Sequence, residues 1–389
     1  MKISILGAGV GGLSTAIALR QKGFDVDIYE RHSALSDIGA GIVCWPNASF
    51  VLNELGLLDE VSAVSGLPVK MQRYSNEGEH LGTLDILKLN TLMGYPSLSV
   101  LRKDLMKVLE RCVVSLGIDI HYGHTVEALV PGSDNAAVIQ FADGSIAKSD
   151  LIIGADGRMN SVARGYVNGD NAPVFQGFIN WIGVFESEMP VFDEIAVNDY
   201  WGVGERFGIV PVSAHKAYWA GAVATKDIGD KAPERYRSEL QSLFGHWPEP
   251  IARIIEETPL SNINKLYVHD HNPLNCWHRD NVLLIGDAAH APLPTSGQGA
   301  CQALEDGWHL ARILADTDGR VDSAIQSFTE LRRSKTTAIT MAARQLAQSL
   351  FNTDAQYCQQ RNMNSLAADY DAVVEGVARY WGEGLPIGE

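Results

Sequence analysis

The sequence predicts an α/β fold that is interrupted by a mostly antiparallel α+β insert and followed by a helical carboxyl-terminal region. Three observations predict this class. A glycine-rich turn separates an apolar strand from a helix at the start of the chain, and a second apolar strand with a glycine–aspartate ending lies at 281–287. Between them, residues 166–273 are rich in aromatic and β-branched residues, which favour strands. The α/β domain is therefore expected to be discontinuous. The expected division is 1–67, 96–165 and 274–340 for the α/β domain, 68–95 and 166–273 for the sheet domain, and 341–389 for the terminal helices.

The first thirty residues have the pattern of a Rossmann-like βαβ unit. An apolar strand at 3–6 meets the turn Gly7–Gly12, a helix runs to about Gln21, and a second strand at 26–30 ends in Glu30. In such units a glycine-rich turn and a later acid hold a dinucleotide. The alternative is an ordinary glycine-rich turn followed by an exposed glutamate.

Each glycine of the turn has a physical reason. Gly7 takes the tight turn off the strand, Gly9 lets the backbone approach a pyrophosphate, and Gly12 allows close helix–strand packing. The turn passes through Gly11 into a helix whose unpaired N–H groups attract phosphates. Glu30 would accept hydrogen bonds from ribose hydroxyls.

Composition excludes several classes of function. The formal charge is −16, which argues against nucleic acid or an anionic membrane surface as the main partner. No apolar run is long enough to span a bilayer, and a strand beginning at residue 3 leaves no room for a signal peptide. The five cysteines are scattered and form no CxxC motif. We therefore expect reduced thiols and a cytoplasmic protein, a monomer or homodimer without a metal site.

The remaining elements follow from periodicity and turn residues. After a glycine-rich stretch at 38–42, the pattern predicts these helices: 48–55, 103–116, 237–244, 250–257, about 299–315, and most of 323–380. It predicts strands within 69–89, at 118–122, as a hairpin over 138–149, and at 151–154 and 281–285.

Asp287 is the candidate ligand residue of the second α/β segment. It follows a buried strand and precedes a helix that starts near Gln298 and Gly299, the place where doubly wound sheets bind ligands. Gly297 and Gly299 allow backbone N–H groups to come close to a ligand, and the helix end would stabilise negative charge. The alternative for Asp287 is a helix N-cap.

Three motifs in this order carry a family resemblance. They are the glycine turn with Glu30 and Arg31, DGRMNSVAR at 156–164, and GDAAHAPLPTSGQG at 286–299. Together they resemble the single-component FAD-dependent aromatic hydroxylases of the para-hydroxybenzoate hydroxylase type, the group A flavoprotein monooxygenases. The segments 45–47, 178–183 and 302–306 are most similar to the branch of urate hydroxylase, salicylate hydroxylase, 3-hydroxybenzoate 6-hydroxylase and zeaxanthin epoxidase.

The resemblance implies a cofactor map. The cofactor would be FAD, with NADH or NADPH as a transient co-substrate. Glu30 would hold the adenosine ribose, Arg31 would lie near the adenine, and Arg102 would reach the ribityl chain or pyrophosphate. Asp156 and Gly157 would belong to a motif that is linked to both FAD and the nicotinamide cofactor. Asp287 would bind the ribityl hydroxyls. The Pro294–Gly299 loop, which contains Gly297, Gln298 and Gly299, would lie along the isoalloxazine. The alternative for Asp156 is a turn-forming role. His290 could contact the Pro294–Gly299 loop, and its alternative is a structural role as a core histidine.

The resemblance also implies the reaction. NAD(P)H would reduce FAD, and reduced FAD would add O2 at C4a to form a hydroperoxide that hydroxylates a small aromatic or N-heteroaromatic substrate. Water must be excluded from such a site, and the aromatic sheet suits that need.

Four residues are candidates for the substrate side: Arg206 and Tyr218, which match the urate-hydroxylase pattern, together with Asn180 and Pro294. Sheet-edge charge is the alternative for Arg206, and a core position is the alternative for Tyr218 and Trp181. Urate hydroxylases carry an acid where this chain has Thr295-Ser296, and the 3-hydroxybenzoate 6-hydroxylases have Gln in place of Pro294. These departures leave the substrate open.

Other flavin chemistry on the same scaffold is the alternative. A halogenase would show Trp-x-Trp-x-Ile-Pro, and a disulfide reductase would show CxxC; the sequence has neither. An epoxidase, another reductase and a non-catalytic FAD-binding protein remain open. Oxygen incorporation into a product would separate these classes.

Overall fold

A six-stranded sheet forms one part of the molecule. The computed structural model describes residues 1–35, 40–132, 136–169 and 172–388, so part of the glycine-rich stretch 38–42 lies outside the described residues. The strand order is β18 (His278–Arg279), β19 (Val282–Leu284), β12 (Leu151–Gly154), β1 (Lys2–Leu6), β2 (Asp25–Glu30) and β8 (Asp119–Tyr122). All neighbouring pairs are parallel except β18–β19. Strand β1 thus lies between β2 and β12, which is distant in sequence.

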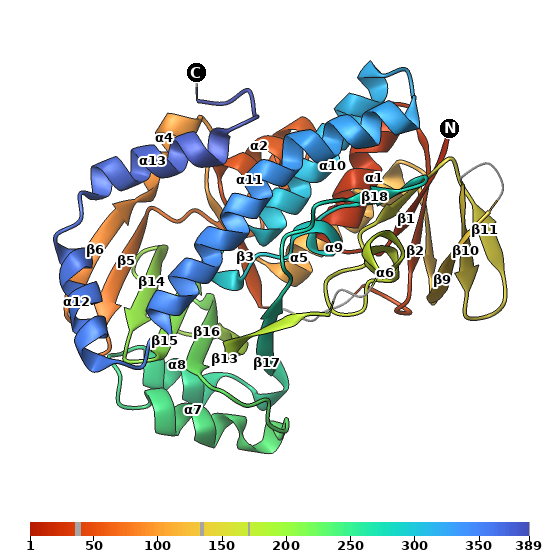
Figure 1. Cartoon of the computed structure of the whole chain (residues 1–389). Helices are drawn as coiled ribbons and strands as arrows, with labels where there is room; N and C mark the ends of the chain where they lie inside the picture. Colours follow the sequence, from red (N-terminus) through yellow and green to blue (C-terminus); the bar gives the residue numbers. More distant parts are fainter. Residues whose placement is uncertain (36–39, 133–135, 170–171, 389) are drawn as a thin grey trace.

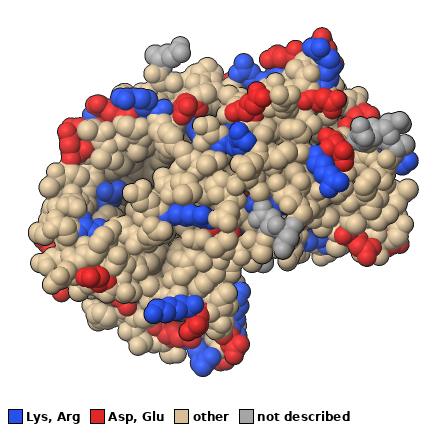
Figure 2. Space-filling view, viewed as in Figure 1, with Lys and Arg blue, Asp and Glu red and all other residues tan. Residues whose placement is uncertain are grey.

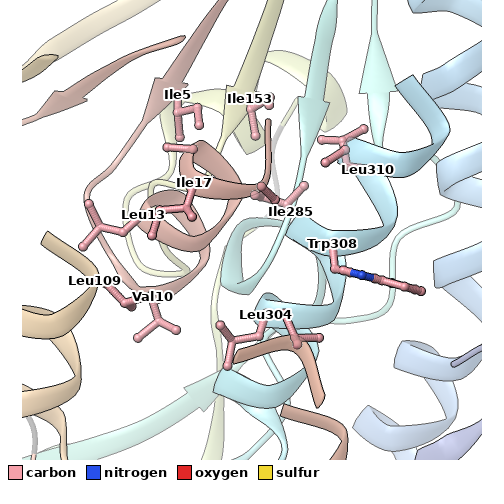
Figure 3. Packing of buried hydrophobic residues seen from close by; sticks show 14 of the residues in the cluster. Ile5, Val10, Leu13, Ile17, Leu109, Ile153, Ile285, Leu304, Trp308 and Leu310 are labelled. Atoms are coloured by element: carbon pink, nitrogen blue, oxygen red, sulfur yellow. The ribbon is translucent and has the colours of Figure 1, made fainter. Parts of the chain in front are cut away.

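Helix α1 (Val10–Gln21) follows β1 and packs against α10 (Gly299–Asp316) and α5 (Arg102–Ser115). Figure 3 shows the apolar contacts of this core, where Ile5 and Ile153 of the sheet approach Leu13 and Ile17 of α1 and Leu310 of α10. The same packing fixes the two glycine-rich turns, after β1 and after β19, at the same edge of the sheet, since parallel strands end together.

A seven-stranded sheet forms the second part (Figure 1). Its order is β17 (Ile263–Asp270), β13 (Val174–Glu186), β16 (Lys216–Ala224), β15 (Glu205–Pro211), β14 (Ala196–Trp201), β5 (Lys70–Ser75) and β6 (His80–Asp85). Only the β14–β5 pair is parallel. Two strands from the first hundred residues therefore extend a sheet built mainly from the insert.

The two faces of this sheet differ. On the outer face, Trp181, Phe207 and Trp219 form an apolar cluster with α7 (Tyr236–Phe244) and α8 (Ile251–Glu257). Trp181 is therefore a core aromatic. Because side chains alternate along a strand, Asn180, Arg206 and Tyr218 all lie on the opposite, inner face.

Three helices follow α10. Helix α11 (Val321–Leu350) packs against α10, while α12 (Ala355–Leu366) and α13 (Tyr370–Gly382) pack against β6, α13 also contacting α4 (Ile86–Met93) (Figure 1). The remaining elements are α2 (Pro46–Glu54), α3 (Leu58–Ser62), α6 (Val162–Asn168), α9 (Asp287–His290), the small sheet β3 (Gly41–Cys44), β7 (Leu98–Leu101) and β4 (Ser65–Gly66), and the sheet β9 (Val126–Pro131), β10 (Ala137–Phe141) and β11 (Ile146–Lys148). In the described parts of the chain, no helix combines the length and apolarity needed to cross a bilayer.

Some local expectations were wrong. The end of the expected strand region 69–89 is helical, because Asp85 caps α4 by accepting a hydrogen bond from the Lys88 N–H and Gly94 ends the helix with φ 77°. The expected hairpin over 138–149 is confirmed as β10 and β11, but β9, which pairs with β10, and the short strand β18 were not predicted. Short or polar strands are identified by their pairing rather than by their own sequence.

Candidate active site

The glycine turn after β1 separates internal packing from ligand space. A Cβ on Gly7 would lie 2.5 Å from the Ala155 carbonyl oxygen, and one on Gly12 would lie 2.0 Å from the Gly7 carbonyl oxygen. Glycine is required at both positions by the protein's own packing. A Cβ on Gly9 would meet nothing within 4 Å, so the backbone there faces open space. At Gly11 a Cβ would approach the Ala303 side chain at 3.3 Å. This turn fits an extended phosphate group, which needs bare backbone N–H groups.

Glu30 lies beside this turn. Its Oε2 accepts a hydrogen bond from the Ala8 N–H at 2.8 Å, and Oε1 accepts one from the His32 N–H at 2.9 Å. The carboxylate therefore holds the turn and keeps lone pairs for a hydroxyl ligand. Arg31 is exposed next to it.

Asp287 lies between two arginines. Its Oδ2 is 3.3 Å from Nη1 of Arg158, and its side chain is 40% exposed. Burial lowers the pKa of Arg102, and the nearby charge of Asp287 opposes that shift. Three motifs that are distant in sequence, containing Arg102, Arg158 and Asp287, therefore meet at one place.

Asp156 is engaged inside its own loop. It accepts hydrogen bonds from the Ser161 hydroxyl and, at 3.1 Å, from the Ala163 N–H. Burial raises its pKa, and these hydrogen bonds oppose the shift. Gly157 has φ 80° and faces open space. The contacts of Asp156 are those of the turn-forming alternative, whereas Gly157 leaves room for a ligand.

The Pro294–Gly299 loop is held from below by polar side chains. Pro294–Ser296 form a 3₁₀ turn, and Gly297 is left-handed with φ 62°. Gln298 is 1% exposed, and its Oε1 accepts hydrogen bonds from Asn47 and Gln302, each at 3.0 Å. The sequence segments 45–47 and 302–306, noted above for their resemblance, thus meet under this loop.

A buried ionic network continues from these amides. Its members are Glu305, Asp306, Arg332 and Lys335, together with His290, which lies beside Asp306. Burial opposes ionisation of Glu305, but the charges of Arg332 and Lys335 outweigh it and lower its pKa. Nε2 of His290 donates a hydrogen bond to Oδ2 of the Asp306 carboxylate at 2.6 Å, which is the structural role given as its alternative. We call these five residues the buried network.

The inner face of the seven-stranded sheet has a row of small side chains at its centre. Ala220 pairs with Gly208, and Gly208 pairs with Asp199. A Cβ on Gly208 would meet nothing within 4 Å, although β15 is an internal strand. At one end of the face, Phe178 and Ala222 pack against Leu293 and α11; at the other, Tyr218 packs against Gly41. The open space over Gly208, which we call the hollow, lies between these contacts.

Arg206 and Tyr218 flank the hollow, each two residues along its strand from the central row. Nε of Arg206 donates to Asp199 Oδ1 at 2.6 Å, and Asp199 also accepts from Trp201 Nε1 at 2.8 Å. Among the described residues, the two Nη groups of Arg206 have no hydrogen-bond partner, and its side chain is 27% exposed. Asn180 lies one strand beyond Ala222 and is 9% exposed.

Tyr218 lies near Cys44 of β3 and near Cys301 of α10, the helix that follows the Pro294–Gly299 loop. Burial raises its pKa well above the ordinary value, and Cys44 and Cys301 contribute to the shift. Cys301 lies at the start of α10, where its thiol approaches the Gly297 carbonyl. The phenol therefore stays protonated and can donate a hydrogen bond next to this loop.

Sequence reasoning missed Asp199 and Arg73, which share the row of Gly208. Strand alternation could place each on a face, but no sequence signal brings β5 next to β14. Two other hollows lie elsewhere, a water-sized one of about 10 Å³ beside His271 and His290 and a shallow one on the outer face beside Trp181 and Lys265. Neither contains the predicted site residues. The described residues hold no cluster of metal-ligating side chains.

Comparisons with known proteins identify the family of the chain. Residues 1–343 match the family model of the FAD binding domain. The chain is 34% identical to the aurachin C monooxygenase/isomerase of Stigmatella aurantiaca, over 81% of each chain, and 32% identical to an FAD-dependent urate hydroxylase of Mycolicibacterium vanbaalenii, over 88% of this chain and 87% of that one. A crystal structure of Klebsiella pneumoniae HpxO complexed with FAD and uric acid superposes with a TM-score of 0.89 at 26% identity, covering 98% of this chain and 96% of that one. The chain therefore belongs to the FAD binding domain family, among relatives that are FAD-dependent monooxygenases and hydroxylases.

Proposed function

We propose that this protein is an FAD-dependent, NAD(P)H-consuming monooxygenase that inserts one oxygen atom from O2 into a small aromatic or N-heteroaromatic substrate. The observation that carries the proposal is the open space over Gly208, which the polar side chains of Arg206 and Tyr218 flank on the inner face of the sheet. In our assignment, FAD is bound by the discontinuous α/β domain, residues 1–67, 96–165 and 274–340. The substrate is bound by the sheet domain, residues 68–95 and 166–273, and the sheet is covered by the terminal helices, residues 341–389. We propose a cytoplasmic monomer or homodimer.

The residues at the edge of the six-stranded sheet fit FAD. The open backbone at Gly9 suits the pyrophosphate, and Glu30, with Arg31 nearby, suits the adenosine end. Asp287 and Arg102 suit the ribityl chain, and Gly297, Gln298 and Gly299 suit the ring. When bound, FAD supplies the redox chemistry, accepting a hydride from NADH or NADPH and activating O2.

The inner face would orient and activate the substrate. The free Nη groups of Arg206 would bind an acidic oxygen of the substrate, and a cation there favours the ionised, electron-rich form of a phenol. The protonated Tyr218 hydroxyl would donate a hydrogen bond from the opposite side of Gly208, and the amide of Asn180 would complete the polar set. Pro294 would bound the ring from the loop.

Water exclusion follows from the rest of this face. Ile182, Ala220, Ala222 and Leu293 surround the hollow with apolar surface. A dry site prevents loss of the activated oxygen as hydrogen peroxide.

The experiment is oxygen incorporation. Purified protein is tested for bound FAD, and NADH and NADPH consumption is followed across phenols and N-heteroaromatics under ¹⁸O2. A product heavier by one labelled oxygen atom supports the proposal. Cofactor consumption that yields only peroxide for every compound would contradict it.

Gly9→Ala tests the cofactor map. The substitution meets no protein atom, so we expect an unchanged fold but at least ~10-fold weaker FAD retention, because the new methyl group would occupy the path of the pyrophosphate. FAD release is measured by fluorescence, with the fold checked by circular dichroism. Asp287→Ala should also weaken FAD binding; full occupancy in both variants would argue against the map.

A further inference from the structure

Arg73 is a cation on the inner face of the seven-stranded sheet. It lies on β5, in register with Asp199, which is in register with Gly208. Neighbouring strands are ~4.8 Å apart, so the backbone of Arg73 is about 10 Å from that of Gly208, a distance that a ring-sized ligand with a carboxylate substituent can span. No residue in the described part of the chain forms an ion pair with it.

The Arg73 guanidinium is held by rings rather than by acceptors. Its Cζ lies 5.3 Å from the centroid of Trp201 and 5.4 Å from that of Tyr370, so the two aromatic side chains bracket it. Of its five N–H donors, one has a partner among the described residues, because Nη1 donates to the Tyr370 hydroxyl at 3.2 Å. The others stay available.

The aromatic bracket is itself fixed. Trp201 donates its indole N–H to Asp199, and the Tyr370 hydroxyl hydrogen-bonds with Ser365 at 2.7 Å. Tyr370 also lies directly over Gly82, where a Cβ would be 2.1 Å from its hydroxyl oxygen. The cation is therefore preorganised, which lowers the entropy lost when it binds a ligand.

The local charge favours an anion. Asp199 is the nearest acid on this face, and Arg206 already pairs with it. Arg361 adds a positive charge near Asp199, but its donors are used by the carbonyls of Ser349, Leu350 and Gly202. Arg73 is thus a locally uncompensated cation in a chain whose formal charge is −16. Figure 2 shows a hollow in the surface between α13 and α11 with basic side chains in its floor.

We propose that Arg73 is a specificity residue that binds a carboxylate of the substrate, so that the natural substrate is an aromatic or N-heteroaromatic acid rather than a neutral ring. This inference rests on the proposed function, since it assigns the far end of the same hollow. The carboxylate lies toward β5 and α13, and the ring to be oxidised lies over Gly208. A planar guanidinium binds a carboxylate with two parallel hydrogen bonds, which a lysine cannot reproduce.

The test compares matched acids and amides on the FAD-loaded protein without NAD(P)H. The probes are 3- and 4-hydroxybenzoate and the corresponding hydroxybenzamides, and binding is read from the change in the flavin absorbance spectrum and by calorimetry. We expect the better acid to bind at least ~10-fold tighter than its amide. Arg73→Gln should remove that preference with little change for the amide, and Arg73→Lys should restore only part of it.

Lys88→Gln is the matched control. Lys88 also contacts α13, through Asp371 and Glu375, but it lies on the exposed side and should not alter the acid-to-amide ratio. An unchanged ratio in Arg73→Gln, a wild-type preference for the amides, or failure of both acids to bind would overturn the inference. If the acids bind through Arg73 but no labelled product forms under ¹⁸O2, the proposed function fails and the carboxylate site stands. If only neutral rings are hydroxylated, the proposed function stands and the carboxylate site fails.

Discussion

Two clusters built from arginine and aspartate differ in how fully their hydrogen-bonding groups are used. In the buried network, Arg332 is 1% exposed and bonds to Glu305, to Asp306 at 2.7 Å and to Gln302 at 2.7 Å. Lys335 bonds to Glu305 at 2.9 Å and to the carbonyls of Trp381 and Glu383, each at 2.8 Å. Each side-chain nitrogen of Arg332 and Lys335 therefore has at least one hydrogen-bond partner in the protein.

The inner-face cluster is left incomplete. Arg206 uses only Nε on Asp199, and Arg73 uses only one donor, on a neutral hydroxyl. Both clusters join distant segments, but only the second offers charged donors to a ligand. The difference indicates that a saturated network supports structure, whereas unused donors beside open space mark a binding site.

The two clusters should differ most in how much the free energy of unfolding falls when one arginine is removed from each. Arg332→Met leaves two buried carboxylates short of a cation, and we expect a loss of about 3–5 kcal/mol in the free energy of unfolding. Arg206→Met removes a partly exposed partner and should cost about 1 kcal/mol. Urea denaturation of the FAD-loaded proteins measures both, and equal losses would refute the distinction.

Acid sensitivity is the second way to separate the regions. Burial lowers the pKa of His309, beside the buried network, from 6.5 to about 3, and Arg332 adds to this shift while Glu305 and Asp306 oppose it. The native state therefore keeps this imidazole neutral while the unfolded chain binds a proton, so stability is complete above pH 6.5 and falls as the pH drops toward 3. At pH 5 the loss amounts to about 2 kcal/mol.

His309→Gln should remove that part of the pH dependence. The measurement is the free energy of unfolding at pH 7.5 and at pH 5, since the difference between the two is independent of any uniform destabilisation. Glu305 and Asp306 also have lowered pKa values in the native state, so their contribution to stability is lost only as the pH falls below their ordinary values of 4.5 and 3.8. They therefore contribute little to the difference between pH 7.5 and pH 5. Arg206→Met, in the other cluster, should keep the wild-type dependence. The same slope in His309→Gln as in wild type would contradict the assignment.

The sequence could predict what is local and periodic. The turn at Gly7–Gly12 and the loop around Asp287 each combine a buried strand, glycines and a helix start within a short segment, so their chemistry is visible without a structure. Alternation along a strand even places Asn180, Arg206 and Tyr218 once the register is known.

The partners of those residues were not predictable. Arg73 reaches the site because β5 pairs with β14, more than a hundred residues away in the chain, and Tyr370 comes from a helix that packs across β6. Sheet pairing of this kind depends on the whole packing arrangement, and no local pattern records it. The buried network was equally hidden, because its members lie on helices whose contacts follow from tertiary packing.

The last contrast compares the two faces of the same sheet through its glycines. In Gly208→Val the new side chain points into the hollow, where its Cβ meets no protein atom within 4 Å, so we expect the free energy of unfolding to change by no more than about 0.5 kcal/mol. Gly221→Val points to the outer face, where a Cβ would lie 2.9 Å from Phe244 and 3.1 Å from Phe207, and it should destabilise the fold by about 1–3 kcal/mol.

Ligand binding should show the opposite order, with the larger effect at position 208. The valine at 208 occupies substrate space and should weaken hydroxybenzoate binding at least ~10-fold, measured as the flavin spectral change, while FAD retention stays normal. The valine at 221 lies behind the sheet and should leave binding intact in whatever fraction folds. A Gly208→Val protein that binds the acids as tightly as wild type would show that the space over Gly208 is not where the substrate lies.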